Sequence, residues 1–129
     1  MSSLTACLAL AATLNSLAPA VITAIHAVER GGVGTVAHNR NGTEDLGPMQ
    51  VNTLWIPTIA AATGESRTAV RVRLINDPCF NATIAGAILA RFLDETHGDL
   101  WRAIGFYHTR LPLQAARYQL AVAVAAAEQ

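Results

Sequence analysis

The chain has 129 residues, which is enough for one domain with a hydrophobic core and too few for two, so we expect a single domain over residues 1–129. Hydrophobic residues make up 52% of the sequence and charged residues 14%, and this composition excludes a disordered chain. The formal net charge of zero argues against a nucleic-acid-binding surface and favours a neutral or mixed ligand or a protein partner.

The composition predicts an all-α fold, because much of the apolar content is alanine and blocks of residues typical of strands are scarce. A first helix is expected over residues 4–16, and a second from about Pro19, which suits a first helical turn, to Gly31. Residues 31–48 are polar and rich in glycine and asparagine. A loop of this length in a small domain is usually functional.

Five further helices are expected over residues 52–63, 66–74 and 79–96, from Asp99 through Gly105, and from Pro112 to the end of the chain. Ser66, Asp77 and Asp99 precede three of them and are of the residue types that cap helix N-termini. Trp55 and Trp101 are predicted to belong to the core. No segment is long and apolar enough to predict a membrane span.

Glu29 has an unusual place in the second helix. Ile22, Ile25 and Glu29 are spaced i, i+3 and i+7, so they share one helix face and the carboxylate lies on an apolar stripe. It also lies at the negative end of the helix dipole. Both effects raise the pKa of the carboxyl group, as a general acid requires near neutral pH. The alternative is a side chain that extends past the helix end into water.

Cys7 and Cys79 are too far apart in sequence for a CxxC redox or zinc motif. A disulfide between them would close a loop of about 70 residues, contribute roughly 4 kcal/mol in the chain-entropy model, and imply an oxidising compartment such as the periplasm. Two unpaired buried thiols are the alternative.

The N-terminal segment is a poor secretory signal. Its apolar run, residues 8–12, is short, and no lysine or arginine precedes it. We therefore interpret residues 4–16 as a helix of the mature protein and expect that any export signal has been removed or replaced.

Five short segments occur in a characteristic order: Ala24–Glu29, Asn39–Asn52, Leu74–Asn81, Gly86–Ala90 and Trp101–His108. Together they resemble the lysozyme-like lytic transglycosylases, whose catalytic domain is similar to goose-type lysozyme. The chain looks most like the small periplasmic members that accompany secretion systems and pili. The resemblance implies an all-α, lysozyme-like single domain.

The resemblance also implies roles for individual residues. Glu29 would be the sole catalytic acid and base, and Cys7 and Cys79 would form the disulfide of the secretion-associated members. The implied substrate-binding residues are Gly47, Met49, Gln50, Asn52 and Tyr107, and His108 is expected to bind substrate because it lies beside Tyr107. No metal and no cofactor are expected.

The implied reaction is cleavage of the β-1,4 bond between N-acetylmuramic acid and N-acetylglucosamine in peptidoglycan, which leaves 1,6-anhydro ends. Such an enzyme would be a periplasmic monomer that acts on glycan strands, for local wall remodelling during assembly of a secretion system or pilus. Components of that machine would be its further partners.

The chain departs from the family pattern at three places. Arg30 replaces the usual serine after the glutamate, and an ion pair with Glu29 would lower the pKa of that carboxyl group. Pro48 stands in the Gly-Leu-Met-Gln motif and removes a backbone donor. His108 begins the triplet that replaces Asn-Ala-Gly after Tyr107.

Two alternative functions therefore stay open. In the first, the departures leave a weakly active or inactive module that binds glycan or an assembly partner. In the second, Asp45 activates a water molecule and the protein is a hydrolytic muramidase. Solvated loop acids are the commoner role for residues such as Glu44 and Asp45.

Overall fold

The computed structural model describes residues 3–129 and is mostly helical, which confirms the all-α prediction. The helices are α1 (Leu4–Leu14), α2 (Pro19–Glu29), α3 (Ile56–Thr63), α4 (Arg67–Asn76), α5 (Pro78–Glu95), α6 (Leu100–His108) and α7 (Pro112–Ala127). A short 3-10 helix, η1 (Thr53–Trp55), precedes α3.

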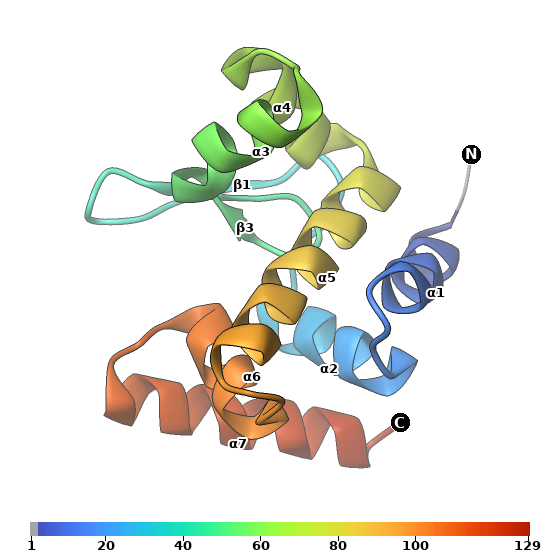
Figure 1. The fold of residues 1–129 in the computed structure, drawn as a ribbon, viewed down its shortest axis with the longest axis vertical. Helices are drawn as coiled ribbons and strands as arrows, with labels where there is room; N and C mark the ends of the chain where they lie inside the picture. Colours follow the sequence, from blue (N-terminus) through green and yellow to red (C-terminus); the bar gives the residue numbers. More distant parts are fainter. Residues whose placement is uncertain (1–2) are drawn as a thin grey trace.

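Helix α5 crosses the middle of the molecule and organises the packing (Figure 1). Helix α1 packs against α5 and α2, α2 packs against α7, and α6 packs against both α5 and α7. A disulfide between Cys7 and Cys79 joins α1 to the first turn of α5, as the resemblance implied. This arrangement places α2 beside the last helix, α7.

Residues 31–48, expected to be a loop, contain two strands of a small antiparallel sheet. The strands are β1 (Val36–His38), β2 (Glu44–Leu46) and β3 (Val51–Asn52), in the order β1-β2-β3. Three-residue strands with polar side chains lack the alternation that identifies a strand in a sequence. The sheet projects from the helices toward the left in Figure 1.

The predicted helix caps are confirmed. The side chains of Ser66, Asp77 and Asp99 accept hydrogen bonds from backbone N–H groups three residues later, at 3.0 to 3.1 Å. The helix expected over residues 52–63 begins only at Ile56, because the Asn52 side chain caps η1 instead.

Both tryptophans were predicted to belong to the core, and neither is fully buried. Trp101 is 48% exposed on α6, so its core assignment was wrong. Trp55 is only partly buried and packs edge-on against Phe92, with ring centroids 6.0 Å apart. Aromatic rings that remain accessible in this way can contact a ligand. Within residues 3–129, no helix is both long and apolar enough to cross a membrane.

Candidate active site

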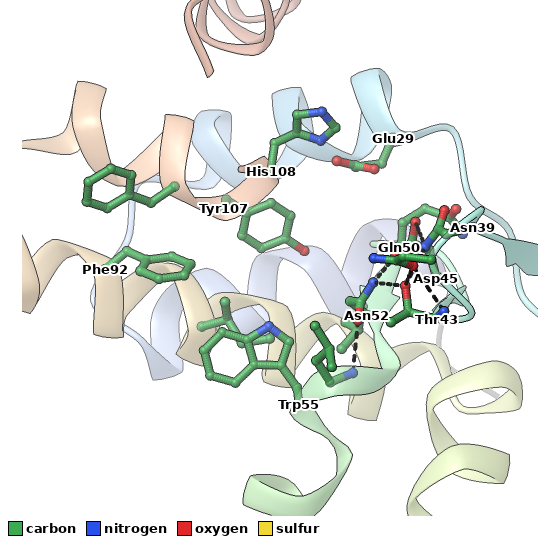
Figure 2. Close-up of a pocket in the computed structure, with 15 residues that line it drawn as sticks. Glu29, Asn39, Thr43, Asp45, Gln50, Asn52, Trp55, Phe92, Tyr107 and His108 are labelled. Carbon is green, nitrogen blue, oxygen red and sulfur yellow. Dashed lines mark hydrogen bonds between the residues drawn. The ribbon is translucent and has the colours of Figure 1, made fainter. Parts of the chain in front are cut away.

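A cleft of about 420 Å³ lies between the small sheet and helices α2, α5 and α6 (Figure 2). Of the residues expected at the site, those that line it are Glu29, Gln50, Asn52, Tyr107 and His108. Gly47 and Met49 do not line it, although the Gly-Leu-Met-Gln motif predicted that they would. Both are buried behind the wall, and Met49 is fully inaccessible.

Glu29 is the last residue of α2, and its backbone position is set by the turn that follows. Ile22 and Ile25, on the same face, are fully buried, as the spacing predicted. Arg30 adopts a left-handed conformation with φ of 57°, and its N–H donates to the His26 carbonyl at 2.8 Å. The helix therefore stops with the half-buried Glu29 side chain at the cleft wall.

Burial raises the pKa of Glu29 from 4.5 to about 7. A contribution from Tyr118 lowers it, and the negative charge of Asp45 raises it further. The increase predicted from the apolar helix face is confirmed. At neutral pH a large fraction of Glu29 is therefore protonated and able to donate.

Arg30 does not oppose this increase. Its side chain is exposed, and the ion pairs formed within residues 3–129 do not include it. The ion pair between Arg30 and Glu29, which the sequence left open, is therefore not formed in this structure.

The turn from Gly47 to Gln50 is held from behind by Asn81, which is fully buried. The Asn81 side chain accepts from the Met49 N–H at 2.9 Å and donates to the Leu46 and Leu74 carbonyls, both at 2.8 Å. Pro48 is buried in this turn without disturbing these bonds. The turn is thus a rigid wall for the cleft despite the proline.

Tyr107 and Gln50 complete this wall. The Tyr107 hydroxyl donates to the Met49 carbonyl at 2.9 Å. Burial, together with the charges of Glu29 and Asp45, raises the pKa of Tyr107 well above 10. The Gln50 side-chain amide donates to the Gly47 carbonyl at 3.0 Å, which orients its carbonyl end for other partners.

Asp45 faces the cleft from β2 and is not a solvated loop acid. The side-chain amides of Asn39 and Asn52 donate to its two oxygens at 3.1 and 3.0 Å. Asn52 lies directly opposite Asp45 in the register of β2 with β3. Figure 2 shows this hydrogen-bonded group on the side of the pocket facing Glu29. A second carboxylate is thereby fixed near the first.

Tyr118 of α7 is the residue of this site that sequence reasoning missed. It is only 7% exposed, and its hydroxyl makes no hydrogen bond of normal geometry with any residue between 3 and 129. Burial first, then the charge of Glu29, raises the pKa of Tyr118. No local pattern marks this tyrosine, because α7 reaches α2 only in the tertiary fold.

The aromatic floor of the cleft was also missed. Phe92 of α5 lies edge-on to both Trp55 and Phe106, with ring centroids 6.0 Å apart in each pair, and all three line the pocket. Accessible aromatic rings beside amide and carboxylate groups suit a ligand with both apolar and polar faces, such as a sugar ring. Within the described residues, no three potential metal ligands are clustered.

Comparison with known proteins identifies similar chains. The family model described as the transglycosylase SLT domain matches residues 6–111. The chain is also similar to the Invasion protein IagB of Salmonella typhimurium and of Salmonella typhi, with 29% identity over 75 residues. This stretch is 58% of the present chain and 43% of the relative, so the match covers less than half the length of these curated relatives. The family match and the helical structure together confirm the lysozyme-like fold class.

Proposed function

This chain belongs to the family of transglycosylase SLT domains, and we propose that it is a peptidoglycan lytic transglycosylase with Glu29 as its acid and base. One observation carries the proposal: a carboxyl group with a pKa of about 7 lies on the wall of a cleft that has polar and aromatic linings. This combination supplies both a proton and a surface for a sugar chain.

The first step uses the protonated form of Glu29. It donates its proton to the glycosidic oxygen between N-acetylmuramic acid and N-acetylglucosamine, and the bond from that oxygen to C1 breaks. The positive charge that develops at C1 is stabilised by the 2-acetamido group of the substrate, a known alternative to a protein nucleophile.

The second step uses the anionic form of Glu29. The carboxylate accepts the proton of the C6 hydroxyl group, and the C6 oxygen bonds to C1 to form the 1,6-anhydro ring. No water is consumed, and Glu29 ends protonated as it began. One carboxyl group with a pKa near neutrality is suited to both roles.

A hydrolytic muramidase is the second candidate, and the position of Asp45 favours it. Asn39 and Asn52 hold the Asp45 carboxylate at the cleft, where a second acidic residue could activate a water molecule or stabilise positive charge at C1. The product would then carry a reducing end. The Asp45→Asn variant would lose activity in this case, while Glu29→Gln would be inactive in both.

A binding module is less well supported. It was considered because of Arg30 and Pro48, but Arg30 is exposed and Pro48 lies in a turn with its hydrogen bonds in place. Neither residue obstructs the cleft. Binding without cleavage remains the outcome indicated if purified protein releases no glycan fragments.

We further propose that the protein acts in the periplasm, in wall remodelling during assembly of a secretion system or pilus. The disulfide supports an oxidising compartment. The similarity to a protein named an invasion protein is compatible with a role beside such a machine. Deletion of the gene should reduce assembly of that machine, and the Glu29→Gln gene should not restore it.

The deciding experiment is mass spectrometry of fragments released from purified peptidoglycan. The wild type and the control Glu128→Gln, which changes an exposed glutamate at the end of α7, should release fragments with 1,6-anhydro ends. Glu29→Gln should release none. Reducing ends would support the muramidase and Asp45, and release of equal products by Glu29→Gln would refute the proposed role of Glu29.

A further inference from the structure

His108 and Tyr118 form a stacked pair at the edge of the cleft. Their ring centroids are 4.7 Å apart, and the rings are nearly parallel, with an interplanar angle of 5°. His108 is the last residue of α6 and is exposed, whereas Tyr118 is buried in α7. The imidazole therefore covers one face of the tyrosine ring on the side that borders the cleft.

The backbone of α7 is fixed to α6 at other points. The Gln119 side chain donates to the Trp101 carbonyl at 2.6 Å. A Cβ atom added to Gly105 would lie only 3.2 Å from the Cβ of Ala115, so the two helices approach closely there. These contacts set the position of the Tyr118 backbone but not the rotation of its side chain, because none of them involves its ring.

The Tyr118 hydroxyl is not anchored by a conventional hydrogen bond. It is buried and has no hydrogen-bond partner within residues 3–129, although the charge of the Glu29 carboxyl group contributes to the raised pKa of Tyr118. A buried hydroxyl group without a partner keeps its place only while its ring is restrained, and packing in the hydrophobic core is one restraint on the Tyr118 ring. Stacking with His108 supplies such a restraint on the ring.

We propose that His108 is a positioning residue, whose imidazole stacks on the Tyr118 ring and helps to keep the hydroxyl near the Glu29 carboxyl group. The proposal rests on the proposed function, in which Glu29 is the acid and base. His108 acts through Tyr118 and not through contact with the reacting atoms. A flat ring at position 108 is therefore the property that matters, and the charge of the imidazole is not.

The test is the pKa of Glu29, measured by carbon NMR of its carboxyl group in variants of the full chain. Tyr118→Phe should raise this pKa by at least about half a unit, because Tyr118 lowers it in the wild type. His108→Ala should raise it in the same direction, and His108→Phe should leave it near the wild-type value. Asp45 and Tyr107, the other groups that interact electrostatically with Glu29, are unchanged in all three variants.

A double variant separates positioning from a general structural role. If His108 acts only through the Tyr118 hydroxyl, His108→Ala should have no further effect on the Glu29 pKa in the Tyr118→Phe background. An unchanged pKa in His108→Ala would overturn the proposal. The proposal would also be overturned if the two substitutions changed the Glu29 pKa additively in the double variant, or if His108→Phe changed this pKa as much as His108→Ala does. If His108→Ala does not fold, His108→Leu provides an apolar side chain without a ring.

Turnover measured in parallel distinguishes the failure of this proposal from the failure of the proposed function. In an active enzyme, His108→Ala should lower kcat about tenfold or more with little change in KM, and His108→Phe should restore most of it. An inactive wild type with the expected pKa pattern would refute the function and support the positioning. If the wild type is active and His108→Ala changes neither kcat nor the Glu29 pKa, the proposed function is supported and the positioning role of His108 is refuted.

Discussion

Gly31 lies directly against the backbone of Gly47, so the end of α2 and the turn that forms the cleft wall are in contact. A Cβ atom at Gly31 would be 2.2 Å from the Gly47 carbonyl oxygen and 2.6 Å from that of Pro48. Because Gly31 follows Glu29 by only two residues, this contact sets the distance of the catalytic candidate from the wall. His26 adds a hydrogen bond to the Gly31 carbonyl at 3.1 Å.

The Gly31→Ala variant should therefore lose both stability and activity. Its methyl group would meet backbone atoms that cannot move aside, at a cost of at least about 2 kcal/mol, and the displaced Glu29 should reduce turnover by about 100-fold. Denaturant unfolding and peptidoglycan release measure the two effects. Gly32→Ala is the matched control, because its Cβ would make only an ordinary 3.5 Å contact with Thr35. Equal losses of stability and activity in Gly31→Ala and Gly32→Ala would contradict this account.

Asn81 should be essential for the folded turn. Replacing it by leucine leaves the Met49 N–H and the carbonyls of Leu46 and Leu74 without partners in a buried site. We expect a loss of more than about 3 kcal/mol in the free energy of unfolding, because each buried unpaired group costs about 1–3 kcal/mol. Asn76→Ala, at an exposed position on α4, should change stability by less than about 0.5 kcal/mol. Near wild-type stability of Asn81→Leu would show that the turn does not depend on these bonds.

The raised pKa of Glu29 makes stability depend on pH. Between pH 4.5 and about 7 the folded protein retains a proton that the unfolded chain has released, so the stability from this group falls as pH rises through this window. Glu29→Gln lacks this effect. The stability of Glu29→Gln relative to the wild type should increase across the window, by about 3 kcal/mol, and level off above it. A constant difference in melting temperature from pH 4 to pH 8 would be inconsistent with a raised pKa.

The same ionisation should appear in the kinetics. In the proposed mechanism Glu29 must be protonated to donate to the glycosidic oxygen, so kcat/KM should fall about tenfold per pH unit above the pKa of about 7 in the free enzyme. Asp94→Asn, which removes an exposed carboxylate on α5, should leave this profile unaltered. An alkaline limb that begins well above pH 8 would assign the acid to another group.

The Cys7–Cys79 disulfide should stabilise the protein without being required at the cleft. It closes a separation of 72 residues, and the chain-entropy model predicts a contribution of about 4 kcal/mol. The double variant Cys7→Ala/Cys79→Ala should unfold at lower denaturant concentration and no longer respond to reductant. Neither cysteine lines the cleft, so the folded fraction should keep its activity. If reductant does not change the stability of the wild type, and the wild type and the variant unfold at the same denaturant midpoint, the disulfide contributes little to stability.

Much of the site depends on local sequence. The position of Glu29 on a helix face with Ile22 and Ile25 indicated a raised pKa, and the structure agrees because both isoleucines are fully buried. Helix starts at Ser66, Asp77 and Asp99 were predictable for a similar reason, since a cap is a contact between residues three apart.

Other features required contacts between distant segments. Strand pairing placed Asn52 opposite Asp45 and turned a presumed loop acid into a fixed carboxylate at the cleft. Trp101 is apolar but 48% exposed, which its residue type and its helical spacing did not indicate.

The sequence by itself determined the helical architecture and pointed to Glu29 as the candidate acid, because helix periodicity, caps and the apolar stripe around Glu29 are relations within one turn or two. Only the tertiary structure decided what surrounds that acid. The Tyr118 hydroxyl, the His108 ring stacked on it and the amide-held Asp45 come from α7, α6 and the sheet. The effects of burial, Tyr118 and Asp45 on the pKa of Glu29 arise from proximity in the folded chain, which no spacing along the sequence encodes.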